Sequence, residues 1–291
     1  MLGAIRCVTV CAPDLEAISA AYAGFLDYIV CDRGEITAAQ AAAWDCREMQ
    51  GAPTITMRPA GGDDFQFRFV QRPPDPDYEP LTTWGWNASE LIVADVDAMA
   101  ARVAESPFAV VGEPRDLSFS SDIRAMQLRG PGAEIVYLTE FKKPVPGLDV
   151  PAARTAVDRT FIVIVGGASL AELQDFYHDT FDVPRAPAVE SRITTLSKAL
   201  KVSIETLYPI AALPIGGKCL IEADEMPAQV GPRKNIAGHL PPGIAIVTFD
   251  CAAIPAAAQR YGGNSGLPYD SSGEAAVLRG AAGELLELLP V

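Results

Sequence analysis

The stretch LRGPGAEIVYL (residues 128–138) is the starting point for the fold, because the chain repeats it near its end as LRGAAGELLELL (residues 278–289). Each copy combines an arginine, a glycine-containing turn, a glutamate and an apolar run, which predicts a turn leading into a buried strand. The first copy has Tyr137 at the position where the second copy, 150 residues later, has Glu287. A repeat of this kind indicates a duplicated unit.

Two further matches extend the duplication. Residues 7–28 and 162–183 each predict a strand, a helix cap at Asp14 or Ser169 and an amphipathic helix; Tyr177 follows Tyr22 by 155 positions. Residues 90–103 and 244–261 again predict a strand, an aspartate and a helix, and Asp250 lies 155 positions after Asp95.

The segment KKPVPGLDVPAAR (residues 142–154) predicts a linker, because it places three prolines and a glycine between apolar strands. We therefore expect a first domain at residues 1–141 and a second at 155–291. In each half, strand–helix units are followed by short strands bounded by glycine and proline, which favours an α+β fold over strict βα alternation.

Composition excludes several classes of function. A net charge of −14 without a basic run argues against binding nucleic acid or an anionic membrane surface. No segment has the ~18 consecutive apolar residues of a spanning helix, and no leader pattern opens the chain, so we expect a cytoplasmic protein. The six scattered cysteines predict buried, reduced thiols.

The chain resembles the vicinal oxygen chelate superfamily, which includes glyoxalase I, extradiol dioxygenases and bleomycin-resistance proteins. The resemblance rests on V-x-V-x-x-x-D-L-x-x-x-x-x-x-Y from Val8 to Tyr22, on VADVDA at residues 93–98, and on the glutamate-containing endings after Gly132 and Gly283. It implies tandem pairs of βαβββ modules, each half curling into a half-open cup.

The resemblance also implies a divalent metal on the cup floor, held by a histidine early in each module and a glutamate near its end. The corresponding positions are Cys7, Arg68, Ala88 and Tyr137 in the first half, and Ile162 or Phe161, Ala223 beside Glu222, Gly243 and Glu287 in the second. A catalytic divalent site needs at least three strong donors, and the chain has only His178 and His239 as histidines. We therefore expect no metal and no cofactor.

In the first half, we expect Tyr137 to point into the cup beside Cys7 and near Arg68. There it would either bind and polarise a carbonyl or carboxylate, with Arg68 as the charge anchor, or fill the space that the metal left. The loop at residues 72–88 carries Trp84 and Trp86, which would either stack on a flat ligand or fix the connection to the sheet.

In the second half, the corresponding loop at residues 221–243 carries Glu222, Arg233 and His239. With Glu287 these residues would supply general acid/base chemistry, unless the loop is simply a solvated connection. The alanine-rich stretch at residues 38–49 predicts a helix that is part of a cup wall, a subunit contact or a neutral insertion.

The expected function is a metal-independent lyase or isomerase acting by acid/base chemistry on a small carbonyl-bearing metabolite, with aromatic compounds included in that class. The catalytic candidates are His239, Glu287, Glu222 and Tyr137, and the ligand-binding candidates are Cys7, Arg68, Trp84, Trp86 and Arg233. One alternative is a non-catalytic protein that sequesters a small molecule. The other is a metal-dependent dioxygenase or glyoxalase-like lyase with an atypical ligand set around Glu287, His239 and Glu222. A homodimer is expected in either case.

Overall fold

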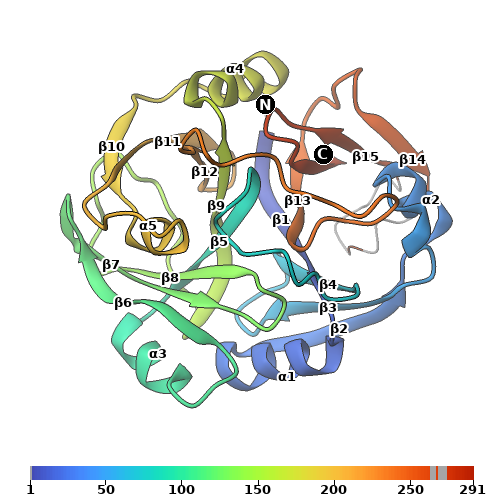
Figure 1. Cartoon of the computed structure of the whole chain (residues 1–291). Helices are drawn as coiled ribbons and strands as arrows, with labels where there is room; N and C mark the ends of the chain where they lie inside the picture. The colour runs from blue at the N-terminus through green and yellow to red at the C-terminus, as the bar shows by residue number, and fades with distance from the viewer. Residues whose placement is uncertain (1, 263–266, 268–273) are drawn as a thin grey trace.

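A computed structural model describes residues 2–262, 267 and 274–291. The strands form two eight-stranded sheets, and each sheet curls around a concave face (Figure 1). Helices α1 and α3 lie together at one side of the molecule, and α4 lies at the opposite side. None of the helices in the described part is long and apolar enough to cross a membrane. The arrangement confirms the α+β expectation.

The first half contains two modules. Module 1 comprises β1 (Leu2–Ala12), α1 (Leu15–Leu26), β2 (Tyr28–Glu35), α2 (Ala38–Ala43), a 3₁₀ turn η1 (Arg47–Met49), β3 (Pro53–Pro59) and β4 (Gln66–Gln71). Module 2 comprises β5 (Gly85–Val93), α3 (Val96–Val103), β6 (Ala109–Leu117), β7 (Ser120–Arg129) and β8 (Ile135–Phe141).

The second half repeats the pattern, except that no helix lies between the first two strands of its last module. Module 3 comprises β9 (Val157–Gly167), α4 (Leu170–Phe181), β10 (Val189–Arg192), α5 (Thr194–Ala199), β11 (Leu207–Ile215) and β12 (Cys219–Glu225). Module 4 comprises β13 (Gly243–Cys251), β14 (Gln259–Gly262), β15 (Glu274–Arg279) and β16 (Leu285–Pro290). Residues 142–156, between the halves, form neither helix nor strand.

Strand pairing crosses the two halves. The first sheet has the order β14-β15-β16-β13-β1-β4-β3-β2, and the second has the order β10-β11-β12-β9-β5-β8-β7-β6. Modules 1 and 4 therefore build one cup, the outer-module cup, and modules 2 and 3 build the other, the inner-module cup. The expectation that each half closes its own cup is wrong. The open edge of a first strand needs a partner, but the first strand of any other module can supply it, so the repeat alone does not select the pairing.

The predicted helix caps are confirmed in three modules. The side chains of Asp14, Asp95 and Ser169 accept hydrogen bonds from backbone N–H groups in the first turns of α1, α3 and α4. The helix predicted after Asp250 is absent: Asp250 lies inside β13, and both of its carboxylate oxygens accept hydrogen bonds from Arg6. Pro255 stands where that helix would run, and proline disrupts a helix interior.

The repeated tyrosine and glutamate form matching buried pairs. The hydroxyl of Tyr22 on α1 donates to Glu134 Oε1 at 3.1 Å, and the hydroxyl of Tyr177 on α4 donates to Glu284 Oε1 at 2.9 Å. The other oxygen of each glutamate accepts from a backbone N–H two residues earlier, at 2.8 Å in both cases. Each pair fixes a helix of one module to the turn before the last strand of the next module. The repeated tyrosine and glutamate that identify the duplication in the sequence therefore make the same contact in both halves.

Apolar residues on the other face of the sheets, away from the cups, join residues of α1, α3 and α4 in one central core. The predicted helix at residues 38–49 is shorter than expected, because α2 ends before Trp44 and only η1 follows. The cysteines are all free thiols; five are buried, and Cys31 on the edge strand β2 is exposed, which corrects the expectation that all six are buried.

Candidate functional site

The floor of the outer-module cup holds a buried ion pair. Arg68 Nη2 on β4 lies 2.9 Å from Glu287 Oε2 on β16, and the side chains are 4% and 0% exposed. Strand register brings them together, because β1 pairs with both β4 and β13, and β13 pairs with β16. Arg68 Nε also donates to Thr9 Oγ1 at 3.0 Å. Glu287 accepts from Thr248 Oγ1 at 2.7 Å and from the Tyr261 hydroxyl.

The outer-module cup is closed above this ion pair. The ring of Trp44, at the end of α2, stacks over Arg68 with 4.5 Å between the guanidinium carbon and the ring centroid, and only 1% of Trp44 is exposed. Cys7 on the same floor is fully buried, and burial raises its pKa to about 12, which keeps the thiol protonated. The charges of Arg68 and Glu287 on this floor therefore neutralise each other, and the ring of Trp44 packs over them.

The inner-module cup has a different floor. Glu90 on β5 pairs in register with Tyr137 on β8, while Glu222 and Asp224 on β12 pair with Ile164 and Gly166 on β9. Glu90 is 9% exposed, Asp224 is 4% exposed and Glu222 is partly buried. Burial is the main influence on the pKa of each of these carboxyl groups, and no lysine or arginine of the described residues is among the other influences. Within that part of the chain, three acids from two strands thus lie near one another without a positive partner.

The pKa values of these acids are high. Burial, with the nearby charge of Glu222, raises the pKa of Glu90 to about 8, and burial raises the pKa of Glu222 to about 7. The pKa of Asp224 is also raised, first by burial and then by the charge of Glu222. Burial raises the pKa of the Tyr137 phenol well above its ordinary range, so it stays neutral and can donate a hydrogen bond.

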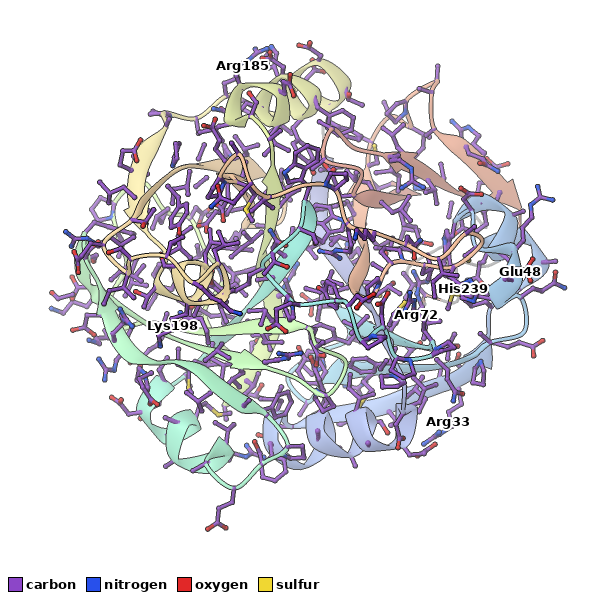
Figure 2. All side chains as sticks on the ribbon, in the orientation of Figure 1. Arg33, Glu48, Arg72, Arg185, Lys198 and His239 are labelled. Carbon is purple, nitrogen blue, oxygen red and sulfur yellow. The ribbon has the colours of Figure 1, made fainter. Side chains whose placement is uncertain are left out.

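Helix α5 covers the inner-module cup as α2 covers the other. The Tyr137 hydroxyl lies 3.2 Å from Thr195 Oγ1, and Ser197 Oγ lies 2.9 Å from the Tyr208 hydroxyl. Lys198, labelled on α5 in Figure 2, donates to the Val111 carbonyl. The alanine-rich insertion of module 1 thus has a counterpart in module 3, and both insertions cover a cup.

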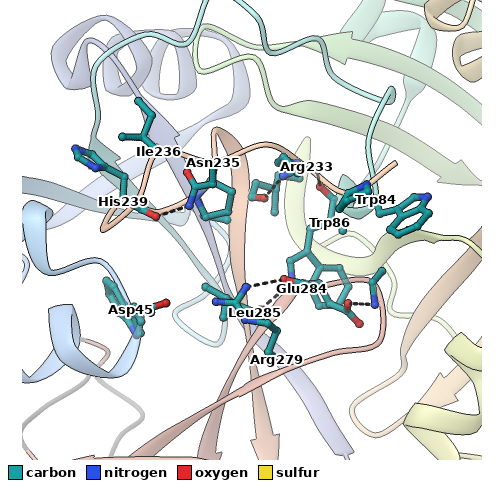
Figure 3. A pocket seen from close by; sticks show the side chains of 18 of the residues that line it. Asp45, Trp84, Trp86, Arg233, Asn235, Ile236, His239, Arg279, Glu284 and Leu285 are labelled. Carbon is teal, nitrogen blue, oxygen red and sulfur yellow. Dashed lines mark hydrogen bonds between the residues drawn. The ribbon is translucent and has the colours of Figure 1, made fainter. Parts of the chain in front are cut away.

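The two long loops are joined by a backbone hydrogen bond. The backbone N–H of Trp84 donates to the Gly231 carbonyl at 2.9 Å, which joins the loop after β4 to the loop after β12. A cleft of about 300 Å³ lies beside this junction, lined by Trp84, Trp86, Arg233 and His239 among others (Figure 3). Trp84, Trp86, Arg233 and His239 are therefore brought together, although they come from different halves of the chain. Glu222, expected on the same loop as Arg233, lies on β12 instead.

Arg233 stabilises this junction between the two loops. Its guanidinium donates to Thr83 Oγ1 at 3.0 Å and to the carbonyls of Pro242, Ile244 and Trp86 at 3.2, 2.8 and 2.7 Å. Trp86 is 1% exposed and donates from Nε1 to the Leu285 carbonyl, so it is fixed rather than free to stack. His239 is half-buried, with Nδ1 placed 3.1 Å from the Ala237 carbonyl.

The structure separates the four predicted catalytic residues. Glu287 lies in the outer-module cup, Glu222 and Tyr137 lie in the inner-module cup, and His239 lies in the cleft. The expected grouping of Tyr137 with Cys7 and Arg68 is wrong, because β8 belongs to the second sheet while β1 and β4 belong to the first. Only Glu222 and Tyr137 share a site.

A resident divalent metal does not fit the floor of the outer-module cup. In the outer-module cup the guanidinium of Arg68 already neutralises Glu287, and a cation beside it would be repelled. Within the described residues, no group of three or more histidine, cysteine, aspartate or glutamate side chains has the arrangement of a metal site. The atypical set of Glu287, His239 and Glu222 is divided among three places.

One residue of the inner-module cup was missed by sequence reasoning. Glu90 sits inside the strand that was expected to supply Ala88, whereas Asp224, two positions beyond Glu222 on the same face of β12, belongs to the run of carboxylates for which acid/base chemistry was considered. A charged residue inside an otherwise apolar, buried strand was a usable signal, because such residues are rarely buried without a role.

Comparison with known proteins supports the fold. No protein-family model matches the chain, and no curated protein sequence matches it significantly. Glyoxalase I from Zea mays superposes with a TM-score of 0.63 at 11% identity, covering 99% of this chain and 92% of that chain. A putative dioxygenase from Bacillus subtilis subsp. subtilis str. 168 superposes with a TM-score of 0.60 at 9% identity, covering 99% and 85%.

Proposed function

We propose that this chain, which has the tandem four-module fold of the vicinal oxygen chelate superfamily, is an enzyme that transfers protons on a small carbonyl-bearing substrate without a resident metal. The observation that carries the proposal is the group of three acids, Glu90, Glu222 and Asp224, on the floor of the inner-module cup without a cation. Groups with strongly perturbed pKa values in a concave site are typical of active sites.

The residues of this floor include a general base and the hydrogen-bond donors that a proton transfer next to a carbonyl needs. Glu222, with a pKa of about 7, is the general base that removes a proton from the carbon next to the carbonyl. The electron pair of that C–H bond moves onto the carbonyl oxygen, giving an enolate. The neutral phenol of Tyr137 and the protonated carboxyl of Glu90 donate hydrogen bonds to the enolate oxygen. Glu222 then returns the proton to carbon, which completes an isomerisation or epimerisation.

The outer-module cup serves as scaffold in this proposal. Its glutamate is fully satisfied by Arg68, Thr248 and Tyr261, and Trp44 closes the space above the ion pair. A general base must be free to take a proton, and a carboxylate held by three donors is poorly suited to that role. The duplicated fold would thus keep one cup for chemistry and one for stability.

Deuterium incorporation from the solvent tests the proposal across a panel of candidate substrates. Metal-free protein is incubated in D₂O with small ketones, aldehydes and 2-oxo acids, and exchange at the carbon next to the carbonyl is followed by NMR. We expect protein-dependent exchange with at least one compound class, and its loss by roughly 100-fold or more in Glu222→Gln. Glu205→Gln, which changes an exposed acid in module 3, is the matched control.

The alternative of a sequestering protein predicts a different result. Such a protein would bind a panel compound with no exchange above the rate in buffer, and Glu222→Gln would not change a rate. Exchange that appears only after a divalent metal is added would contradict the proposal directly.

A further inference from the structure

Two acceptor oxygens facing the inner-module cup have no partner. Asp224 Oδ1 and Asn87 Oδ1 are both buried and make no hydrogen bond within the part of the chain that the structure describes. Asp224 and Asn87 are each 4% exposed. A buried acceptor without a donor is costly, so two of them on the strands that flank β9 call for a ligand that supplies donors.

The side chain of Asn87 reaches this floor because Gly166 has no side chain. Gly166 pairs in register with Asp224, and a Cβ atom on Gly166 would stand only 2.4 Å from Asn87 Nδ2 and 2.8 Å from Met226 Sδ. The amide of Asn87 therefore lies over Gly166, next to the strand position of Asp224. Its Nδ2 contacts Met226 Sδ at 3.8 Å, which leaves Oδ1 as the unused acceptor.

The chemistry of the floor is one-sided. Asp224 and Asn87 offer unpartnered acceptor oxygens and Glu222 adds a carboxyl group nearby, while no lysine or arginine of the described residues influences the pKa of Glu222 or Asp224. An ammonium group is complementary to these acceptors, since it carries one positive charge and three N–H donors and accepts nothing. A carboxylate or phosphate brings only acceptor oxygens and would leave Asp224 Oδ1 and Asn87 Oδ1 without donors.

We propose that the inner-module cup binds the ammonium group of a primary amine between Asp224 and Asn87, whose Oδ1 atoms have no partner within the described residues. This inference rests on the proposed function in one respect: if both hold, the substrate is an amino-carbonyl compound, with its ammonium group on these acceptors and its carbonyl toward Tyr137. The binding step itself does not depend on any reaction.

Three isosteric probes test the binding step: propylammonium, 1-propanol and propionate, each titrated into the purified full chain by isothermal calorimetry. We expect saturable one-to-one binding of propylammonium and no detectable binding of the alcohol or the acid. Asp224→Asn keeps the size of the side chain, removes its charge, and should weaken propylammonium binding by roughly ten-fold or more. Asn87→Ala should weaken it less, and Glu205→Gln should leave it unchanged. Thermal melts establish that each variant is folded, and Glu222→Gln is the second charge-removing variant if Asp224→Asn does not fold.

Equal binding of propylammonium and 1-propanol, or an unchanged affinity in folded Asp224→Asn and Glu222→Gln, would overturn the inference. The outcomes separate from those of the proposed function. Deuterium exchange without propylammonium binding would support the enzyme proposal and contradict the proposed binding of an amine. Propylammonium binding without exchange on any carbonyl compound, amino-carbonyl compounds included, leaves an amine-binding protein and removes the enzyme.

Discussion

Arg68 Nη2 lies 2.9 Å from Glu287 Oε2 on the floor of the outer-module cup, at two strand positions where the family resemblance implies metal ligands. The guanidinium thus provides the positive charge that a metal would provide, from within the chain. In the inner-module cup, no cation among the described residues influences the pKa of the acids. This contrast between two cups of one duplicated fold underlies the different roles that we assign to them.

Breaking the buried ion pair from one side should be costly. Arg68→Met leaves Glu287 buried without its cation, and we expect a loss of roughly 3–5 kcal/mol in the free energy of unfolding. The double variant Arg68→Met/Glu287→Leu removes both charges and should recover much of that loss. Urea denaturation of the single and double variants measures the coupling. A double variant as unstable as the sum of the single variants would show that the charges do not interact.

The stability of the protein should fall as pH rises from about 5 to 8. The pKa values of Glu134, Glu284 and Glu222 are about 7, and that of Glu90 is about 8, all raised mainly by burial. A raised pKa means that the folded state holds more protons than the unfolded chain between pH ~4.5 and the folded pKa. The stabilising contribution is therefore complete below pH ~4.5 and is lost as pH rises through 7 to 8.

Thermal melts across this pH range measure the trend. Glu222→Gln, which cannot titrate, should flatten it relative to the parent chain, and Glu205→Gln should not. A parent Tm that rises steadily from pH 5 to pH 8 would contradict the assignment of raised pKa values.

The two tyrosine–glutamate pairs should be energetically alike. Tyr22→Phe and Tyr177→Phe each remove one hydroxyl donor from a buried glutamate, and each should cost about 1–2 kcal/mol because the backbone N–H remains on the other oxygen. Tyr78→Phe is the control, since its ring faces Arg233 and its hydroxyl makes no hydrogen bond within the described residues. Chemical denaturation compares the three. A large loss in only one of the pairs would show that the repeat no longer has the same role in both halves.

Arg233 should act as a clamp between the two long loops. Its planar group donates to four oxygens on separate backbone or side-chain positions, and the ammonium of a lysine cannot reach them all. We expect Arg233→Lys to lower stability by roughly 2 kcal/mol and to speed proteolysis in the loop at residues 226–242. The exposed neighbour Lys234 provides the matched control as Lys234→Ala. Equal rates of proteolysis in Arg233→Lys and Lys234→Ala would contradict the role of Arg233 as a clamp.

Divalent metals should neither bind stoichiometrically nor stabilise the protein. We expect no shift in Tm on adding equimolar Zn²⁺, Ni²⁺, Co²⁺ or Mn²⁺, because the outer-module cup holds a guanidinium and, within the described residues, no three or more histidine, cysteine, aspartate or glutamate side chains are arranged to hold an ion. Elemental analysis after dialysis gives the stoichiometry. One tightly held ion per chain would require a different interpretation of the cups.

The modules could be predicted from the amino-acid sequence. The register of Tyr22 with Tyr177 and of Glu134 with Glu284 was readable because these residues make repeated contacts that each copy must keep. The helix caps at Asp14, Asp95 and Ser169 were predictable because a cap depends on the next three residues.

Which modules share a cup depends on the completed fold. Pairing β1 with β13 and β5 with β9 joins strands from different halves of the chain, and each edge would accept another first strand equally well. That choice separates Tyr137 from Arg68 and joins Arg68 to Glu287, so it determines which acids are neutralised and which are not. Burial and the charge of a neighbouring group arise only when distant strands pack together, and the pKa values that suggest chemistry appear only there.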